Sequence, residues 1–246
     1  MKYEGMVFKT NTCGNLVVIK YINSRNTLVK FIDTGYECLA DMGNIKRGEV
    51  KDKLLPSVQG VGILGDEPVR ENDQLLKEYK LWQDMLKRCY NNKFHDTRPT
   101  YKGCSVSNNF RYYPYFKEWC NKQIGFDQDG FDLDKDILSR GTKVYSEDTC
   151  CFVPKEINNS FTVITNKKSN YYVGVSYHKK FGKFYSRLNK FGKQTSLGYF
   201  DTELEAFHAY KHAKEDYAKE LAEKWKEQID LRVYDTLMKY KIEISD

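Results

Sequence analysis

The stretch from Tyr172 to Glu203 constrains the fold of this chain most strongly, because glycines divide it into three short segments. These glycines are Gly174, Gly182, Gly192 and Gly198. In the middle segment, Phe184 and Leu188 alternate with polar residues, which is typical of a half-buried strand. A helix is predicted to begin at Asp201 or Thr202, where a capping side chain precedes apolar residues at positions 206, 209, 210 and 213. The stretch therefore predicts a three-stranded sheet packed on one helix.

Basic side chains accumulate in the same stretch, and no Asp or Glu falls between Lys167 and Lys193. The basic residues are Lys167, Lys168, Lys179, Lys180, Lys183, Arg187, Lys190 and Lys193. Because side chains alternate along a strand, the middle strand has two different faces. One face carries Lys183, Tyr185, Arg187 and Asn189, and the other carries Phe184, Ser186 and Leu188. The second face can meet the helix, whereas the basic face indicates a polyanionic partner and suits the major groove of DNA.

The stretch resembles the Apetala-two/ethylene-response-factor DNA-binding domain of plants, which also occurs in phage homing endonucleases. The matching segments are Tyr172-Val-Gly-Val, Gly182-Lys-Phe, Leu197-Gly-Tyr-Phe-Asp-Thr and Glu205-Ala-Phe-His-Ala-Tyr, with Ala213. The resemblance implies that the outer face of the sheet reads double-stranded DNA. By position, the implied reading residues are Ser176, His178, Lys180, Lys183, Arg187, Asn189, Gln194 and Ser196. Ser176, His178 and Ser196 stand where Arg or Trp is usual in that family, so its target sequence is not transferable.

The chain is long enough for several domains, with 246 residues and a formal net charge of only +6. No apolar run approaches the roughly 18 residues of a membrane span, and no apolar leader begins the chain. We therefore expect no membrane partner. The 7 cysteines have no regular spacing and no Cys-x-x-Cys pair, which favours buried, reduced thiols over a zinc site. These features predict a protein of a reducing cytoplasm, and the resemblance to phage proteins implies that the cytoplasm is that of a bacterial host cell.

Residues 1–70 are predicted to form a small β-barrel. Leu16–Ile22 and Thr27–Ile32 are strand-like runs joined by a short polar connection. The glycine-rich connector at residues 55–65 lacks the spacing of a phosphate-binding loop. A structural cap, a partner-binding module and an additional DNA-contacting arm all remain open for this segment.

Residues 71–165 are predicted to form a second domain, with helices over about 72–90 and 112–123. Asn72 or Asp73 can cap the first helix. The acidic loop that follows does not fit an EF-hand, because its glycine and glutamate are misplaced when counted from Asp127. Residues 133–138 and 145–159 then follow in the order strand, loop, strand, helix.

This region resembles a phage family grouped with the HNH (ββα-metal) endonucleases. The matching motifs are Trp82-Gln-Asp-Met-Leu-Lys-Arg-Cys-Tyr and Tyr101-Lys-Gly-Cys-Ser-Val, followed by the strand–loop–strand–helix segment. Residues 1–70 also look like a segment attached to phage nucleases of this kind. The resemblance implies a phage or mobile-element origin.

Such an enzyme needs a base and a divalent metal ion. The resemblance places Asp134 where a histidine base is usual, followed by Asp136, and offers Asn158 and Asn159 at the helix. In one alternative, Asp134, Asp136 and Asn158 or Asn159 hold Mg²⁺ or Mn²⁺, and His95 or a water molecule acts as base. In the other, catalysis is weakened or lost, because an aspartate of pKa about 3.9 is a weaker base than a histidine near 6.5.

The sequence thus predicts an α+β, multidomain protein with a small β-barrel (1–70), an HNH-like core (71–165), a three-stranded DNA-binding domain (166–214) and a C-terminal helix (215–246). The last helix packs on the rest of the chain or forms a homodimer. We expect a sequence-specific DNA-binding protein descended from a homing endonuclease and acting as a transcriptional regulator or repressor. The alternatives are an active endonuclease that nicks or cleaves a specific site, and an RNA-binding or structural protein with a lysine-rich face.

Overall fold

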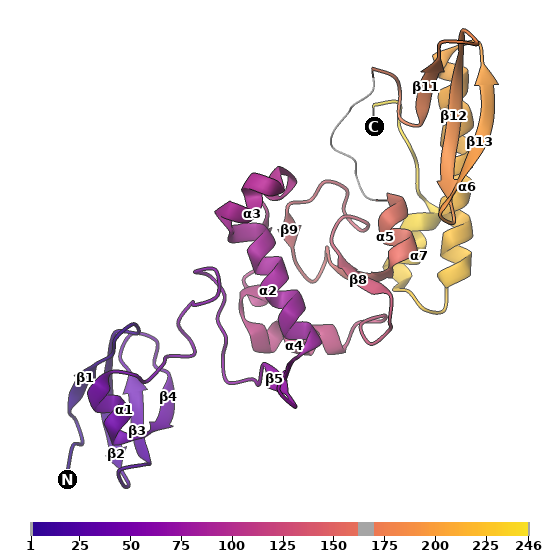
Figure 1. Cartoon of the computed structure of the whole chain (residues 1–246). Coiled ribbons are helices and arrows are strands. Elements are labelled where there is room, and N and C mark those ends of the chain that lie inside the picture. The colour runs from indigo at the N-terminus through magenta and orange to yellow at the C-terminus, as the bar shows by residue number, and fades with distance from the viewer. Residues whose placement is uncertain (1, 162–169, 246) are drawn as a thin grey trace. The chain divides into compact units, whose positions relative to one another are not determined.

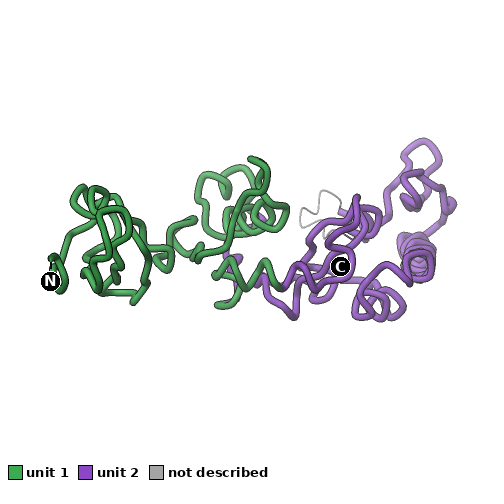
Figure 2. Tube along the Cα trace, turned by 90° about the horizontal axis from the view of Figure 1, so that it is seen from below, with its two compact units in different colours: residues 1–99, 108–118 green, residues 100–107, 119–246 purple. Residues whose placement is uncertain are grey.

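The computed structural model describes residues 2–161 and 170–245, which form a mixed α+β structure with several small sheets (Figure 1). The chain divides into two compact units. The first comprises Met1–Pro99 and Asn108–Glu118, and the second comprises Thr100–Ser107 and Trp119–Asp246 (Figure 2). Within the described ranges, no helix is both long and apolar enough to cross a membrane.

The first unit begins with a four-stranded antiparallel sheet in the order β1-β2-β3-β4. Its strands are Val7–Lys9, Asn15–Tyr21, Thr27–Phe31 and Glu37–Ala40, and the helix α1 (Met42–Arg47) follows. The connection between β2 and β3 is the predicted hairpin, in which Tyr21 pairs with Thr27. One face of the sheet forms a core with Ile45 of α1.

The prediction of a closed barrel is wrong. β1 and β4 remain the two edges of the sheet, and no pairing joins them in the part of the chain that the structure describes. Strands of three to seven residues in a four-stranded sheet are too few and too short to close on themselves. Met42 and Ile45 of α1 are buried in the core that the sheet forms on one face, so this core is covered without closure.

Helices dominate the rest of the first unit. β5 (Arg70–Glu71) and β6 (Gln74–Leu75) form a hairpin before α2 (Lys77–Tyr90) and α3 (Asn92–Thr97). The short helix η2 (Asn109–Arg111) then precedes α4 (Tyr113–Asn121). Trp82 of α2 is fully buried, and its Nε1 donates a hydrogen bond to the Phe110 carbonyl at 2.7 Å. Asn72 and Asp73 do not cap α2, because both adopt positive φ, 48° and 61°, in the turn between β5 and β6.

The second unit contains the predicted order strand, loop, strand, helix. β8 (Phe131–Asp134) pairs antiparallel with β10 (Cys151–Pro154), and α5 (Lys155–Phe161) follows β10 directly. The short helix η1 (Pro99–Tyr101) precedes β7 (Ser105–Val106), which pairs in parallel with β9 (Val144–Tyr145).

A three-stranded antiparallel sheet with one long helix on it completes the second unit (Figure 1). The strands are β11 (Val175–His178), β12 (Lys183–Lys190) and β13 (Lys193–Phe200), and the helix is α6 (Glu203–Trp225). Thr202 caps α6 in a capping box with Glu205. Of the two caps predicted from the sequence, Asp201 and Thr202, the structure therefore uses Thr202. α6 runs through residues 214 and 215, so the predicted boundary there falls inside a continuous helix. A second helix, α7 (Leu231–Met238), follows it.

The packing of this sheet on α6 depends on one close approach. Gly174 precedes β11 with φ of 76°, and a Cβ atom added there would lie 2.2 Å from ring atoms of Tyr210. Val175, Ala206 and Phe207 are buried where the sheet and α6 meet. Only glycine allows the strand to come this near to the helix.

Candidate nucleic-acid interface

Strand register brings most of the predicted reading residues onto one face of the sheet. Ser176 pairs with Tyr185, His178 with Lys183, Arg187 with Ser196, and Asn189 with Gln194. The structure therefore brings together seven predicted residues on the face away from α6: Ser176, His178, Lys183, Arg187, Asn189, Gln194 and Ser196. Lys180 is exposed in the turn between β11 and β12.

A bulge changes which residues of β13 reach this outer face. Ser186 pairs with Gly198 and Arg187 pairs with Ser196, so Leu197 is passed over. Ser196 and Tyr199 are three residues apart and would point to opposite faces of a regular strand. The extra residue places both on the outer face, where Tyr199 lies opposite Tyr185.

Aromatic rings occupy one end of the outer face, around His178. The ring of Phe181 stacks on His178 with centroids 4.4 Å apart. Tyr185 and Tyr199 lie edge-on to His178 at centroid distances of 5.9 and 5.7 Å. Phe181 and Tyr199 are 55% and 48% exposed. The imidazole Nδ1 of His178 is buried and has no hydrogen-bond partner among the described atoms.

Sequence reasoning named Tyr185 on this face but missed Phe181 and Tyr199. Phe181 lies in a turn, outside the alternation that assigns faces, and Tyr199 reaches the face only through the bulge. The nearest signal was the aromatic content of the stretch. His178 is accordingly one member of an aromatic cluster and is only half exposed.

Polar and basic side chains occupy the other end. The Arg187 guanidinium donates to Oε1 of Gln194 at 3.1 Å and lies 5.3 Å from the ring centroid of Tyr185. Arg187 thus connects the aromatic end to the amide group of Gln194, which lies opposite Asn189 on the neighbouring strand. All three side chains are exposed, and none has an acidic partner in the described ranges. The guanidinium and amide groups can therefore both donate to base edges.

The lysines of the sheet fall into two groups. Lys183 pairs with Asp201 at 3.0 Å and Lys190 with Glu220 at 2.6 Å, both near the surface. Such pairs contribute little to stability, so a phosphate can replace the carboxylate. Three further lysines are exposed and form no ion pair with any described residue: Lys179, Lys180 and Lys193. Lys167 and Lys168 lie outside the described residues.

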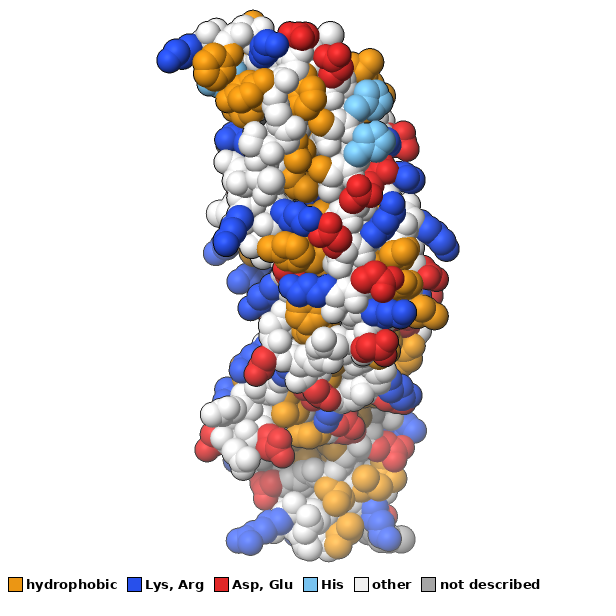
Figure 3. Space-filling view, turned by 90° about the vertical axis from the view of Figure 1, so that its right-hand side faces the viewer, with side chains coloured by type: hydrophobic (Ala, Val, Ile, Leu, Met, Phe, Trp, Pro, Cys, Tyr) orange, Lys and Arg blue, Asp and Glu red, His pale blue; other side chains and the backbone are white. Residues whose placement is uncertain are grey.

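The strands of the sheet differ in charge from the surface of the chain drawn in Figure 3. On the face drawn in Figure 3, Lys and Arg side chains are interspersed with Asp and Glu side chains. The strands β11, β12 and β13 contain no Asp or Glu at all. The excess of positive charge is thus a local property of the three-stranded sheet.

The acidic residues of the ββα segment surround a turn. Oδ2 of Asp134 accepts hydrogen bonds from the backbone N–H groups of Asp136 and Ile137 at 2.8 and 2.7 Å. Burial raises the pKa of Asp134. The ammonium of Lys135, which is buried, lies 2.5 Å from Oδ1 of Asp136 and donates to the Thr142 carbonyl at 3.0 Å. Both carboxylates therefore already have donors within the chain.

A metal ion fits this arrangement poorly. Lys135 supplies the positive charge at Asp136, and no group of three or more His, Cys, Asp and Glu is placed to hold a metal ion within the described ranges. Asn158 and Asn159 both lie on α5, and Asn159 lines a cavity there. His95 lies in the first unit, where Nε2 contacts the Arg88 carbonyl at 2.8 Å.

The adjacent thiols of Cys150 and Cys151 are buried at β10. Burial raises the pKa of Cys150 to about 12 and raises that of Cys151 as well. A thiol must lose its proton to bind zinc, so both side chains are suited to the core and not to a metal site.

Comparison of the chain with protein-family models, with curated proteins and with solved structures found no match. Its function is therefore inferred from the arrangement of its own side chains.

Proposed function

We propose that the chain is a sequence-specific double-stranded DNA-binding protein that places the outer face of β11, β12 and β13 in the major groove. The observation that carries this proposal is the single face on which Arg187, Asn189 and Gln194 lie side by side, on strands that contain no Asp or Glu. Lys180 and Lys193, at the turns of the sheet, are exposed and form no ion pair with any described residue. The major groove is about 12 Å wide and admits a β-ribbon. The resemblance to the Apetala-two/ethylene-response-factor domain supports the same mode of binding.

The side chains of this face divide into base readers and phosphate contacts. Arginine recognises guanine through two hydrogen bonds, and asparagine or glutamine recognises adenine in the same way. We therefore assign base reading to Arg187, Asn189 and Gln194. Lys180 and Lys193 lie in or beside the turns at the two ends of β12, where they can reach the phosphates that flank the groove.

We further propose that the protein descends from a phage HNH homing endonuclease and acts as a transcriptional regulator in the bacterial cytoplasm, with catalysis weakened or lost. The contacts of Lys135 with Asp136 support this, because they supply a fixed cation where the nuclease would need a metal ion. An active endonuclease that uses Mg²⁺ or Mn²⁺ is the second candidate. The order β8, β10, α5 favours it, since this is the order of a ββα nuclease core.

The decisive experiment selects the bound sequence from random double-stranded DNA and measures affinity for it over a range of salt concentrations. We expect tight, salt-sensitive binding to one sequence and weaker binding to RNA of the same sequence. Equal affinity for DNA and RNA would favour the RNA-binding alternative. Supercoiled plasmid with the selected site is then incubated with Mg²⁺ or Mn²⁺. Relaxed or linear product that Asp134→Ala abolishes would establish the endonuclease instead.

A further inference from the structure

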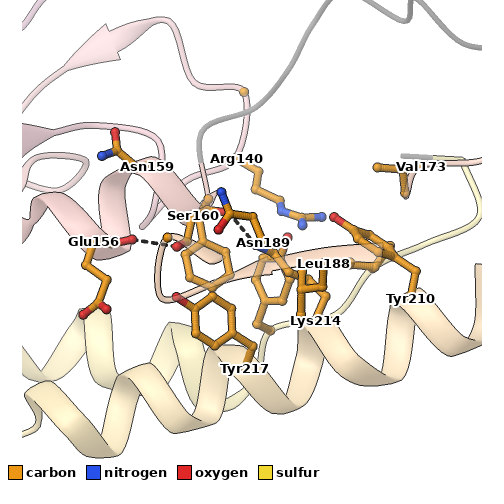
Figure 4. A pocket seen from close by; sticks show the side chains of 15 residues that line it. Arg140, Glu156, Asn159, Ser160, Val173, Leu188, Asn189, Tyr210, Lys214 and Tyr217 are labelled. Carbon is orange, nitrogen blue, oxygen red and sulfur yellow. Dashed lines mark hydrogen bonds between the residues drawn. The ribbon is translucent and has the colours of Figure 1, made fainter. Parts of the chain in front are cut away.

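A cavity of about 950 Å³ lies in the second unit, between α5, the turn end of β12 and β13, and α6 (Figure 4). Its wall includes Leu188 and Val173 together with the rings of Tyr210 and Tyr217. Polar side chains also line it, among them Asn159, Ser160 and Asn189. Most prominent among these is the ammonium group of Lys214, which projects from α6.

Lys214 is only 6% exposed and has unusual surroundings for a buried cation. Its Nζ donates to the Ser160 carbonyl at 2.5 Å. The rings of Phe161 and Tyr217 lie 4.5 and 5.6 Å from Nζ at their centroids. These contacts are a carbonyl and two aromatic faces, and none of them carries a full negative charge.

No carboxylate of the described chain forms an ion pair with Lys214, and residues 162–169 contain no Asp or Glu. Two acidic residues close to it, one at the cavity and one next in sequence, already have partners. Glu156 lines the cavity, but its Oε2 accepts hydrogen bonds from Lys224 and Trp225 at 2.7 and 2.8 Å, and its carboxylate points away from Lys214 (Figure 4). Glu215 is held by Lys241 and Lys211.

A buried charge without a counter-charge is costly, because the carbonyl and rings replace only part of its hydration. Burial lowers the pKa of Lys214 to about 8, which leaves the amine mostly protonated at neutral pH. An anion that entered the cavity would supply the missing negative charge beside the buried ammonium of Lys214. A second cation lies at the same cavity, since Arg140 lines it and its guanidinium lies 4.7 Å from the ring centroid of Tyr240.

We propose that this cavity binds a small aromatic organic anion, whose carboxylate, sulfonate or phosphate group contacts Lys214 and whose ring lies between Tyr210 and Tyr217. The volume suits such a ligand, because small-molecule pockets typically enclose about 300–1,000 Å³. The apolar wall selects for a ring, and the buried ammonium selects for negative charge.

The test uses the full-length protein and the fluorescent probe 8-anilinonaphthalene-1-sulfonate, which combines aromatic rings with one sulfonate. We expect one probe molecule to bind per chain, with an affinity that falls about 10- to 100-fold in Lys214→Met, as for a lost hydrogen bond to a charged group. Lys214→Arg keeps the charge and should restore most of the affinity. Lys219→Met removes a partly exposed lysine of the same helix, which pairs with Asp216 and does not line the cavity, and should leave the affinity unchanged.

A competition assay separates the effect of the ligand's negative charge from the effect of its apolar ring. The anion 2-naphthoate should displace the probe, whereas the neutral 2-naphthamide of the same shape should displace it at least tenfold less well. Thermal unfolding of each variant confirms that it is folded. Failure of the wild-type protein to bind the probe, equal binding to Lys214→Met, or equal displacement by the two competitors would each overturn the proposal.

Discussion

The imidazole of His178 stacks on the ring of Phe181, with centroids 4.4 Å apart and ring planes 13° from parallel. Tyr199 lies edge-on to both rings, at 5.7 and 5.3 Å. Because Phe181 is 55% exposed, it adds little to the core of the sheet. Its main structural effect is to hold His178 on the outer face beside the residues proposed to read DNA.

Replacing Phe181 by serine should therefore weaken DNA binding more than it weakens folding. Loss of an aromatic pair should lower the affinity for DNA by roughly 2- to 10-fold. Fluorescence anisotropy with the selected DNA site measures this change. Phe191→Ser is a matched control, since Phe191 is 45% exposed and contacts Tyr217 of α6 instead. An equal loss of affinity in both variants would show that the cluster around His178 has no special part in binding.

Arg187 and Lys193 should respond differently to removal, because one is assigned to bases and the other to phosphate. Arg187→Ala should cost about 1–3 kcal/mol of binding free energy and relax the sequence preference at one base pair. Lys193→Ala should weaken binding to all sequences alike and reduce the salt dependence by about one released counterion. Repeated selection from random DNA with each variant measures the first effect, and salt titrations measure the second. Unchanged sequence preference in Arg187→Ala would contradict the assignment.

The faces of β12 were predictable from the sequence, because strict alternation fixes which side chains share a face. Lys183, Tyr185, Arg187 and Asn189 lie together as expected. The position of Tyr199 does not follow from alternation, since it depends on a bulge at Leu197, and the only local signal of that bulge is the neighbouring Gly198. Pairing partners are set by the whole sheet and not by one strand.

Other departures from the sequence predictions have the same origin in non-local structure. Asn72 and Asp73 are good helix caps in isolation, but they serve as the two turn residues of the hairpin between β5 and β6. Lys135 has the pattern of an ordinary surface lysine, yet it is buried between Asp136 and the Thr142 carbonyl. The cavity at Lys214 is formed by segments far apart in the chain, and hydrophobic periodicity does not report on it.

Gly174 should be among the least replaceable residues of the sheet. Gly174→Ala requires an alanine at φ of 76° and places its Cβ 2.2 Å from ring atoms of Tyr210, so we expect a loss of about 3 kcal/mol or more. Gly192→Ala has a similar φ of 74° but no atom within 4 Å of the new Cβ, so it should cost only about 1 kcal/mol. Denaturant midpoints of the two variants give the comparison. Equal losses would mean that the close approach to α6 relaxes without cost.

Glu215 should anchor the C-terminal segment to α6 in a pH-dependent way. Its Oε1 accepts from the Ile242 backbone N–H at 3.2 Å, and its Oε2 lies 2.8 Å from Nζ of Lys241. Burial acts to raise the pKa of Glu215, but the hydrogen bonds from Lys241, Lys211 and the Ile242 backbone N–H outweigh it and lower the pKa to about 2.

Because the folded protein lowers this pKa, the stabilising contribution of Glu215 is complete above the ordinary value of 4.5 and is lost as the pH falls through about 2. Glu215→Gln should therefore destabilise the protein by about 2 kcal/mol at pH 7 and progressively less between pH 4.5 and pH 2. Glu220→Gln, which removes the partly exposed partner of Lys190, should cost less than about 1 kcal/mol. Urea unfolding of both variants over this pH range tests the difference. A constant effect of Glu215→Gln at every pH would show that its carboxylate charge does not hold the C-terminal segment.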